Sequence, residues 1–330
     1  MGAGCHGLLA AVAVGAAIAV PAPAAALGNA ERIDFESFTV AGAAQLLRHD
    51  YAPDAKVLVG GRLLLPEASS GRVPLVIVAG GEGGESDGEG RWPARLGSLG
   101  IASFVIDSLA PRGLQSVGLY LDVLSIAAEV TDAFLALQRL ARDPRIDPRR
   151  IAIMGASRGG RVALATALEP LRRSVIAGDA RFAGHIALYA GCDIRFTAAA
   201  IDRAPLLLLH GAADDYAPIG HCRDYAAWFA ARGAAVRFVA LPGAPHGFDR
   251  PGQVTFDATV ATAAGCDLER DLDTMFARRI DTGELVIGRP ALSRYYESCT
   301  GRGAHAGGDA AALAAAERQL EAFLRDIFKL

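Results

Sequence analysis

The sequence predicts an α/β fold in which helices cover both faces of a mostly parallel central sheet. Short runs rich in β-branched residues and leucine alternate with longer amphipathic stretches, as expected for successive strand and helix units. Several of the short runs show no polar alternation, which is typical of strands buried on both faces. Hydrophobic residues make up 52% of the 330 residues, enough to fill a large core.

The pattern predicts two long helices and a series of short strands. Apolar residues recur at helical spacing over residues 119–142, and Asp143-Pro144 ends this predicted helix. A second helix is expected near the C-terminus, where Asp309 is placed to cap a stripe that includes Leu313 and Leu320. The predicted strands are residues 56–65, 74–79, 101–107, 150–154, 185–190, 205–210 and 236–241.

The N-terminal segment has the composition of a cleavable secretory signal. Residues 8–27 are almost wholly apolar and reach the small residues Ala24-Ala25-Ala26, so residues 1–26 are predicted to be removed on export. The segment before the apolar run lacks Lys and Arg, and a membrane anchor is therefore the alternative. We expect a periplasmic or secreted protein that is not inserted in a membrane after signal removal.

The remaining residues, 27–330, are predicted to form a single domain. Residues 250–308 have weak periodicity and several Gly and Asp, which predicts an irregular excursion before the final helix. This excursion could form part of a lid or be a surface decoration. The formal net charge is −3 and no dense run of Lys or Arg occurs, so a nucleic-acid partner is excluded and a small molecule is expected.

Four cysteines follow the predicted signal, an even number in a chain expected to reach an oxidising compartment. Disulfides are therefore expected, with four buried thiols as the alternative. Three pairings are possible. A bridge between Cys266 and Cys299 would hold the excursion together. The cysteines are Cys192, Cys222, Cys266 and Cys299.

The segment "IAIMGASRGG" at residues 151–160 reads as a strand, a tight turn and a helix, with Ser157 at the turn. A serine in this position is held above the sheet as a nucleophile. Small residues at Gly155, Gly159 and Gly160 allow the backbone and the following helix to approach closely.

A serine hydroxyl needs a base, and the base needs an acid that orients it. Asp214 follows one predicted strand and His246 follows the next, so both should lie with Ser157 at one edge of the sheet. Asp215 is the adjacent competitor for the acid. His210 precedes this loop and is interpreted as a structural residue at a strand end.

Two backbone N–H groups are candidates for an oxyanion hole. One belongs to Arg158, at the start of the helix after Ser157, and the other to Glu82, in the glycine-rich loop at residues 80–84. A phosphate cradle is the alternative for this loop, but the loop lacks the Gly-Lys-Ser/Thr ending of a P-loop.

Together, "DPRIDPRRIAIMGASRGG", "GIASFVIDSLAPRG", "HGAADDYAP" and "LPGAPHGF" resemble the dienelactone hydrolase family of α/β-hydrolases, from about residue 56 to 248 and in the final helix. The family's acid stands four residues before a proline, which favours Asp214 before Pro218. Two positions depart from the family. Ser157 replaces the cysteine of members that cleave dienelactone, which favours ordinary esters, and Gly80 stands where the family's loop often has histidine.

The resemblance also implies a disulfide. In the serine-nucleophile, exported branch of the family, a cysteine after the sixth strand and one after the acid loop occur together, as Cys192 and Cys222 do here. Both also follow neighbouring predicted strands at the same sheet edge, where a bridge is geometrically reasonable. This bridge would brace the loop that carries Asp214.

The prediction is a serine hydrolase that cleaves carboxylic esters or lactones through an acyl-enzyme, with no cofactor and no metal. A peptidase or a polyester-degrading esterase on the same fold is the first alternative, because specificity depends on the pocket. An exported binding protein without turnover is the second. The sequence does not predict an oligomeric state.

Overall fold

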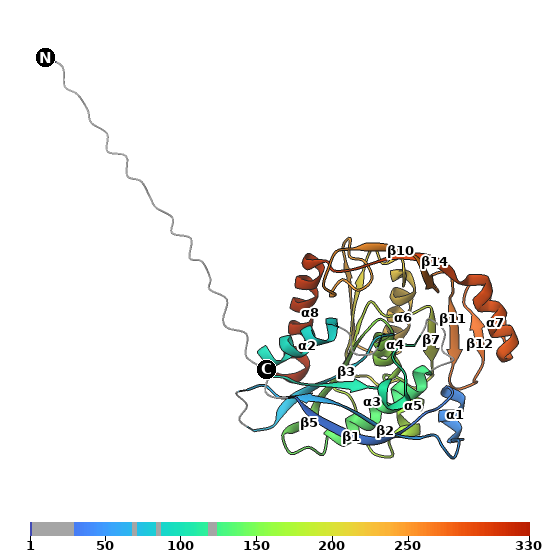
Figure 1. The fold of residues 1–330 in the computed structure, drawn as a ribbon, viewed down its shortest axis with the longest axis horizontal. Helices are drawn as coiled ribbons and strands as arrows, with labels where there is room; N and C mark the ends of the chain where they lie inside the picture. Colours follow the sequence, from blue (N-terminus) through green and yellow to red (C-terminus); the bar gives the residue numbers. More distant parts are fainter. Residues whose placement is uncertain (2–29, 68–70, 84–86, 118–123) are drawn as a thin grey trace.

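The computed structural model describes residue 1 and residues 30–67, 71–83, 87–117 and 124–330. The predicted signal at residues 1–26 therefore lies almost wholly outside the described residues. A central sheet with helices packed around it forms the core of the fold (Figure 1). It has eight strands in the order β1-β2-β4-β3-β5-β6-β8-β9. Strand β2 runs opposite to its neighbours, and the pairings from β4 to β9 are all parallel. The strands are β1 (Glu31–Phe38), β2 (Lys56–Leu64), β3 (Val73–Ala79), β4 (Ala102–Asp107), β5 (Ile146–Ala156), β6 (His185–Leu188), β8 (Leu206–Gly211) and β9 (Val236–Leu241).

Helices pack on both faces of this sheet and bury two separate apolar cores. The larger core lies between the sheet and α1 (Ala43–Arg48), α3 (Ile126–Leu140), α4 (Arg158–Ala165), α5 (Glu169–Val175) and α6 (Ile219–Ala231). The smaller core lies on the other face, against α2 (Asp87–Ser98) and α8 (Ala310–Phe328). The predicted fold class is thus confirmed. Of the helices in the described part of the chain, none combines the length and apolar character needed to cross a membrane.

Most predicted elements occur with shifted ends. Helix α3 begins at Ile126 because the Ser125 hydroxyl accepts a hydrogen bond from the Ala128 N–H, whereas the sequence predicts a start at residue 119. Residues 118–123 lie outside the described residues. The prediction that Asp309 caps the final helix is confirmed, since its carboxylate accepts hydrogen bonds from the N–H groups of Ala311 and Ala312. A short 3-10 helix, η1 (Ala110–Arg112), follows β4.

Residues 250–308 contain regular structure, so the prediction of an irregular excursion is wrong. Strands β10 (Thr255–Thr262) and β14 (Gly301–Ala306) form an antiparallel pair. A second, four-stranded sheet, in the order β13-β12-β11-β7, extends from the domain body. Its strands are β7 (Ile194–Thr197), β11 (Leu268–Asp271), β12 (Ala277–Arg279) and β13 (Leu285–Val286), and α7 (Gly288–Cys299) follows them. Strands of two to four residues are too short to show a period, and β11 pairs with a strand from a distant part of the chain.

Both expected disulfides are present. Cys192 bonds to Cys222 and Cys266 bonds to Cys299. The second bridge joins the turn before β11 to the end of α7, and Cys266 lies in a small core of its own with Leu268 and Tyr295. This bridge therefore closes the excursion around a core that contains few apolar residues.

Replacing Cys266 and Cys299 together with serine is expected to destabilise the protein by about 2–4 kcal/mol. The bridge spans 33 residues, so its loss restores conformational freedom to a long loop of the unfolded chain. Urea unfolding of the double variant and the wild type, followed by circular dichroism, measures the difference. Equal midpoints and slopes would contradict the expectation.

Candidate active site

Ser157 lies at a sharp turn between β5 and α4. Its backbone has φ 54° and ψ −115°, a conformation in which a non-glycine residue is strained. The turn is possible because Gly155 and Gly159, two residues before and after the serine, lack side chains. A Cβ on Gly155 would lie 2.2 Å from the backbone of Gly159, and one on Gly159 would lie 2.2 Å from the carbonyl oxygen of Ala79. The predicted strand, turn and helix are thus present, with the serine at the carboxyl end of β5.

The structure brings Ser157, His246 and Asp214 together. Nε2 of His246 lies 3.0 Å from Oγ of Ser157, and Nδ1 lies 2.8 Å from Oδ2 of Asp214. With Nδ1–H donating to the carboxylate, Nε2 is free to accept the serine proton. The three residues follow β5, β8 and β9, whose carboxyl ends meet at one edge of the parallel sheet.

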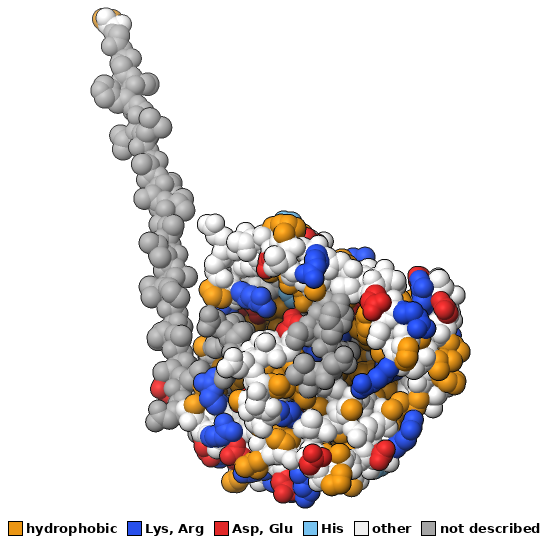
Figure 2. Space-filling model, turned by 45° about the vertical axis from the view of Figure 1, so that its right-hand side comes forward, with side chains coloured by type: hydrophobic (Ala, Val, Ile, Leu, Met, Phe, Trp, Pro, Cys, Tyr) orange, Lys and Arg blue, Asp and Glu red, His pale blue; other side chains and the backbone are white. Residues whose placement is uncertain are grey.

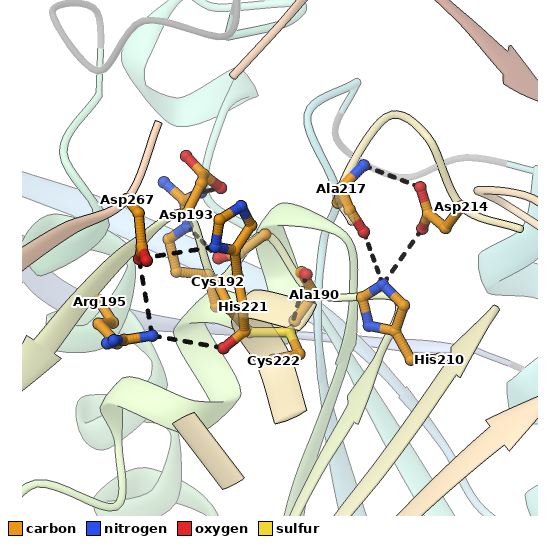
Figure 3. Close-up of a disulfide and its surroundings, with 12 residues drawn as sticks. Ala190, Cys192, Asp193, Arg195, His210, Asp214, Ala217, His221, Cys222 and Asp267 are labelled. Carbon is orange, nitrogen blue, oxygen red and sulfur yellow. Dashed lines mark hydrogen bonds and ion pairs between the residues drawn. A yellow bond between two sulfur atoms is a disulfide. The ribbon is translucent and has the colours of Figure 1, made fainter. Parts of the chain in front are cut away.

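Asp214 is buried and held by several donors. Its Oδ1 accepts hydrogen bonds from the N–H groups of Tyr216 (3.1 Å) and Ala217 (2.8 Å). Nε2 of His210 lies 3.4 Å from Oδ2, and Figure 3 shows one nitrogen of its ring facing both Asp214 and Ala217. Burial alone would raise the pKa of Asp214, but the charge of His246 and hydrogen bonds from both histidines outweigh it. They hold the pKa well below its usual range, so the carboxylate stays ionised beside His246.

Asp215, the alternative acid, and the neighbouring His210 each have a different main contact. Asp215 contacts Nδ1 of His305 (2.7 Å) rather than His246, and this pair is about half exposed. Nε2 of His210 lies 2.7 Å from the carbonyl oxygen of Ala217, which fits the structural role expected from the sequence.

Strand β14 contacts both the loop that carries Asp214 and the loop that carries His246. Besides the contact between His305 and Asp215, Ala306 forms a β-bridge with His246, and the N–H of Gly307 donates to the His246 carbonyl oxygen (3.1 Å). The excursion therefore reaches the base as well as the acid loop.

The two residues predicted to supply the oxyanion hole lie beside the serine. Glu82 and Arg158 line, together with Ser157 and Tyr216, a small cavity of about 40 Å³. The Tyr216 hydroxyl donates a hydrogen bond to the Glu82 carboxylate (3.1 Å). Burial and this neighbouring negative charge raise the pKa of Tyr216, so the hydroxyl remains protonated. Gly84, at the end of the glycine-rich loop, lies outside the described residues.

The side chain of Arg158 is anchored in the interior. Its guanidinium lies 2.7 Å from the carboxylate of Glu129, on α3, and donates a hydrogen bond to the carbonyl oxygen of Leu124 (2.5 Å). Burial raises the pKa of Glu129 to about 7, although the charge of Arg158 opposes the shift. Glu129 could not be recognised from the sequence, since one acidic residue within an amphipathic helix carries no local signal.

The raised pKa of Glu129 predicts a pH dependence of stability. Its folded value of about 7 exceeds the ordinary 4.5, so its stabilising contribution is complete below pH 4.5 and is lost as pH rises through 7. Glu129→Gln cannot ionise, and its free energy of unfolding should therefore rise relative to the wild type between pH 5 and pH 8. Urea titrations at both pH values test this. A constant difference would show that Glu129 does not titrate in this range.

The first disulfide lies next to the acid loop. Cys192 follows β6 and Cys222 lies in α6, the helix that begins just after the Asp214 loop (Figure 3). On the other side of the bridge, the carboxylate of Asp267 lies 3.7 Å from Arg195 and 3.6 Å from His221, which ties β11 to the same region. Among the described residues, no three His, Cys, Asp or Glu side chains are grouped so as to hold a metal ion.

Comparison with known proteins agrees with the motifs. Residues 116–277 match the Dienelactone hydrolase family. No curated protein matches the chain in sequence. A similar solved structure is a dienelactone hydrolase-like promiscuous phosphotriesterase, P91, from metagenomic libraries, with 15% identity, coverage of 90% of this chain and 98% of that chain, and a TM-score of 0.51. Another is the esterase Est2 of Thermogutta terrifontis, with 18% identity and a TM-score of 0.47. The match covers 59% of this chain and 80% of that chain. Residues 116–277 are therefore identified as a dienelactone hydrolase family segment, on the α/β-hydrolase fold described above.

Proposed function

We propose that the protein is a serine hydrolase that cleaves carboxylic esters or lactones through an acyl-enzyme. The observation that supports this most directly is the continuous chain of contacts from Ser157 through His246 to the ionised Asp214. A hydroxyl, an imidazole and a carboxylate in this order have the geometry needed for acyl transfer.

In the proposed reaction, His246 takes the hydroxyl proton as Oγ of Ser157 attacks the substrate carbonyl carbon. The negative charge on the carbonyl oxygen is stabilised by the N–H groups of Glu82 and Arg158. The ester C–O bond then breaks, and His246 gives its proton to the leaving alcohol. Water, activated by the same histidine, attacks the acyl-enzyme, releases the acid and restores Ser157.

A fluorophosphonate probe tests the nucleophile. The wild type should be labelled at Ser157, as identified by mass spectrometry of the modified peptide, whereas Ser157→Ala should not react. An unlabelled wild-type protein would contradict the proposal and favour a binding protein that lacks turnover.

A substrate panel tests the reaction. Nitrophenyl esters and lactones should be cleaved faster than peptide amides or polyester film, because amides and a solid polymer place different demands on the pocket. Hydrolysis of amides alone would establish a peptidase instead, and preferential release of monomers from film would establish a polyester-degrading esterase.

We further propose that the protein is exported and that residues 27–330 form one domain. The apolar segment that ends at Ala24-Ala25-Ala26 supports signal cleavage, and two disulfides suit an oxidising compartment. The intact mass of the protein from its native host tests signal cleavage and the presence of the two disulfides. A mass that retains residues 1–26 would contradict export by a cleaved signal.

A further inference from the structure

A large pocket lies between the excursion and the body of the domain. It has a volume of about 550 Å³, within the range of small-molecule sites. One wall is formed by α1, the start of α3 and Arg161 of α4. The opposite wall is formed by the four-stranded sheet and the start of α7. The excursion therefore creates this pocket.

The sheet side of the pocket is a row of cross-strand neighbours. Arg270 of β11 pairs with Phe196 on one side and with Ala277 on the other, and Ala277 pairs with Val286. All four residues line the pocket. Three apolar side chains and one guanidinium thus share one face of the sheet.

The described part of the pocket lining is positively charged. Among its described residues are four arginines, while none is Asp or Glu. Arg161 is paired, at 2.7 Å, with Asp193. Within the described part of the chain, Arg48, Arg270 and Arg289 have no ion-pair partner, although Arg270 is half-buried. A cation withdrawn from water is normally paired, so the half-buried Arg270 favours a ligand with a negative charge. Arg48 and Arg289 are exposed and add positive charge to the same lining.

The same pocket also suits an apolar chain. Phe276 and Ile287 are 51% and 66% exposed and lie at the pocket, where bound apolar groups would remove them from water. Met275, which also lines the pocket and directly precedes Phe276 in the chain, has φ 64°, an unfavourable backbone conformation for this residue type. Figure 2, which turns the side with β11, β12 and α7 forward, shows hydrophobic and basic side chains next to one another on this face.

The pocket adjoins the candidate active site through Arg161. This residue lies one helical turn after Ser157, and its N–H donates to the Ser157 carbonyl oxygen (3.2 Å). Arg161 lines both the large pocket and the small cavity that contains Ser157 and Glu82. The two cavities therefore lie next to each other, with Arg161 in the wall of both.

We propose that the large pocket binds the part of the ester substrate remote from the scissile bond, and that this part is an apolar chain with a negatively charged group. The inference rests on the proposed function, since it assumes that Ser157 is the site of cleavage. Arg270 and Arg289 contact the anionic group, while Phe196, Phe276 and Ile287 contact the chain.

Binding to Ser157→Ala, the variant that lacks the nucleophile, tests the pocket separately from catalysis. Monoethyl suberate, titrated calorimetrically into Ser157→Ala, should bind at least about tenfold more weakly when Arg270→Gln and Arg289→Gln are added. Arg270→Lys and Arg289→Lys should retain most of the affinity, because the charge is kept. Arg318→Gln, an exposed change on α8, is the matched control. Absent binding, or equal affinity in all variants, would overturn the proposal.

Kinetics then test the link to Ser157. In the otherwise wild-type protein, Arg270→Gln/Arg289→Gln should lower kcat/KM for the 4-nitrophenyl monoester of suberic acid by about tenfold or more. It should leave 4-nitrophenyl octanoate nearly unchanged. Equal losses for both esters would overturn the anionic assignment. If Ser157→Ala binds the monoester but the wild type cleaves neither ester, the proposed function fails and the pocket assignment survives only as a binding site.

Discussion

Ser157→Ala is expected to lower kcat for a nitrophenyl ester by about six orders of magnitude while leaving the protein folded. The change removes the attacking oxygen from the contact with His246, and the strained turn accepts alanine as readily as serine. Steady-state rates with 4-nitrophenyl esters, and circular dichroism of both proteins, measure the two parts.

A double variant sharpens this prediction. Because serine and histidine act as one unit, Ser157→Ala/His246→Ala should be no slower than Ser157→Ala alone. A further thousandfold loss in the double variant would mean that the two residues contribute independently. Substantial activity in Ser157→Ala would exclude Ser157 as the nucleophile.

Asp214→Asn should reduce kcat by about four orders of magnitude. An amide cannot stabilise the imidazolium that forms on His246, and it can hold the ring in the wrong tautomer. The same assay measures the loss.

Two nearby carboxylates serve as comparisons for Asp214. Asp224→Asn, an exposed change on α6, should leave the rate unchanged. Asp215→Asn should cost less than about tenfold, since its carboxylate contacts His305 rather than the base. A larger loss in Asp215→Asn than in Asp214→Asn would reverse the assignment of the acid.

The positions of the three central residues could be predicted from the sequence because each follows a strand that is recognisable by itself. The Ser157 turn is marked by local glycines, and the chain order of Asp214 and His246 reflects the order of parallel strands whose carboxyl ends share one edge. The strand β1 was not predicted, although Ile33 and Phe35 alternate with exposed residues. This alternation, with charged residues on the solvent side, is the pattern of a half-buried strand, so β1 could have been recognised from the sequence.

The excursion could not be predicted because its structure depends on distant partners. The strand β11 pairs with β7, about seventy residues earlier, and the pocket joins α1, α4 and α7. Similarly, the contact between Glu129 and Arg158 links two helices. Periodicity reports which face of an element is buried, but it does not report which other element covers that face.

The attachment of β14 to the base and to the acid loop limits how far the protein can be shortened. A minimal enzyme that ended after Phe248 would retain all three central side chains, yet it would lack Ala306 and Gly307, which hold the backbone of His246. Engineering that exchanges residues 250–308 for a simple linker must therefore rebuild these backbone contacts, whereas surface changes on α7 leave them intact.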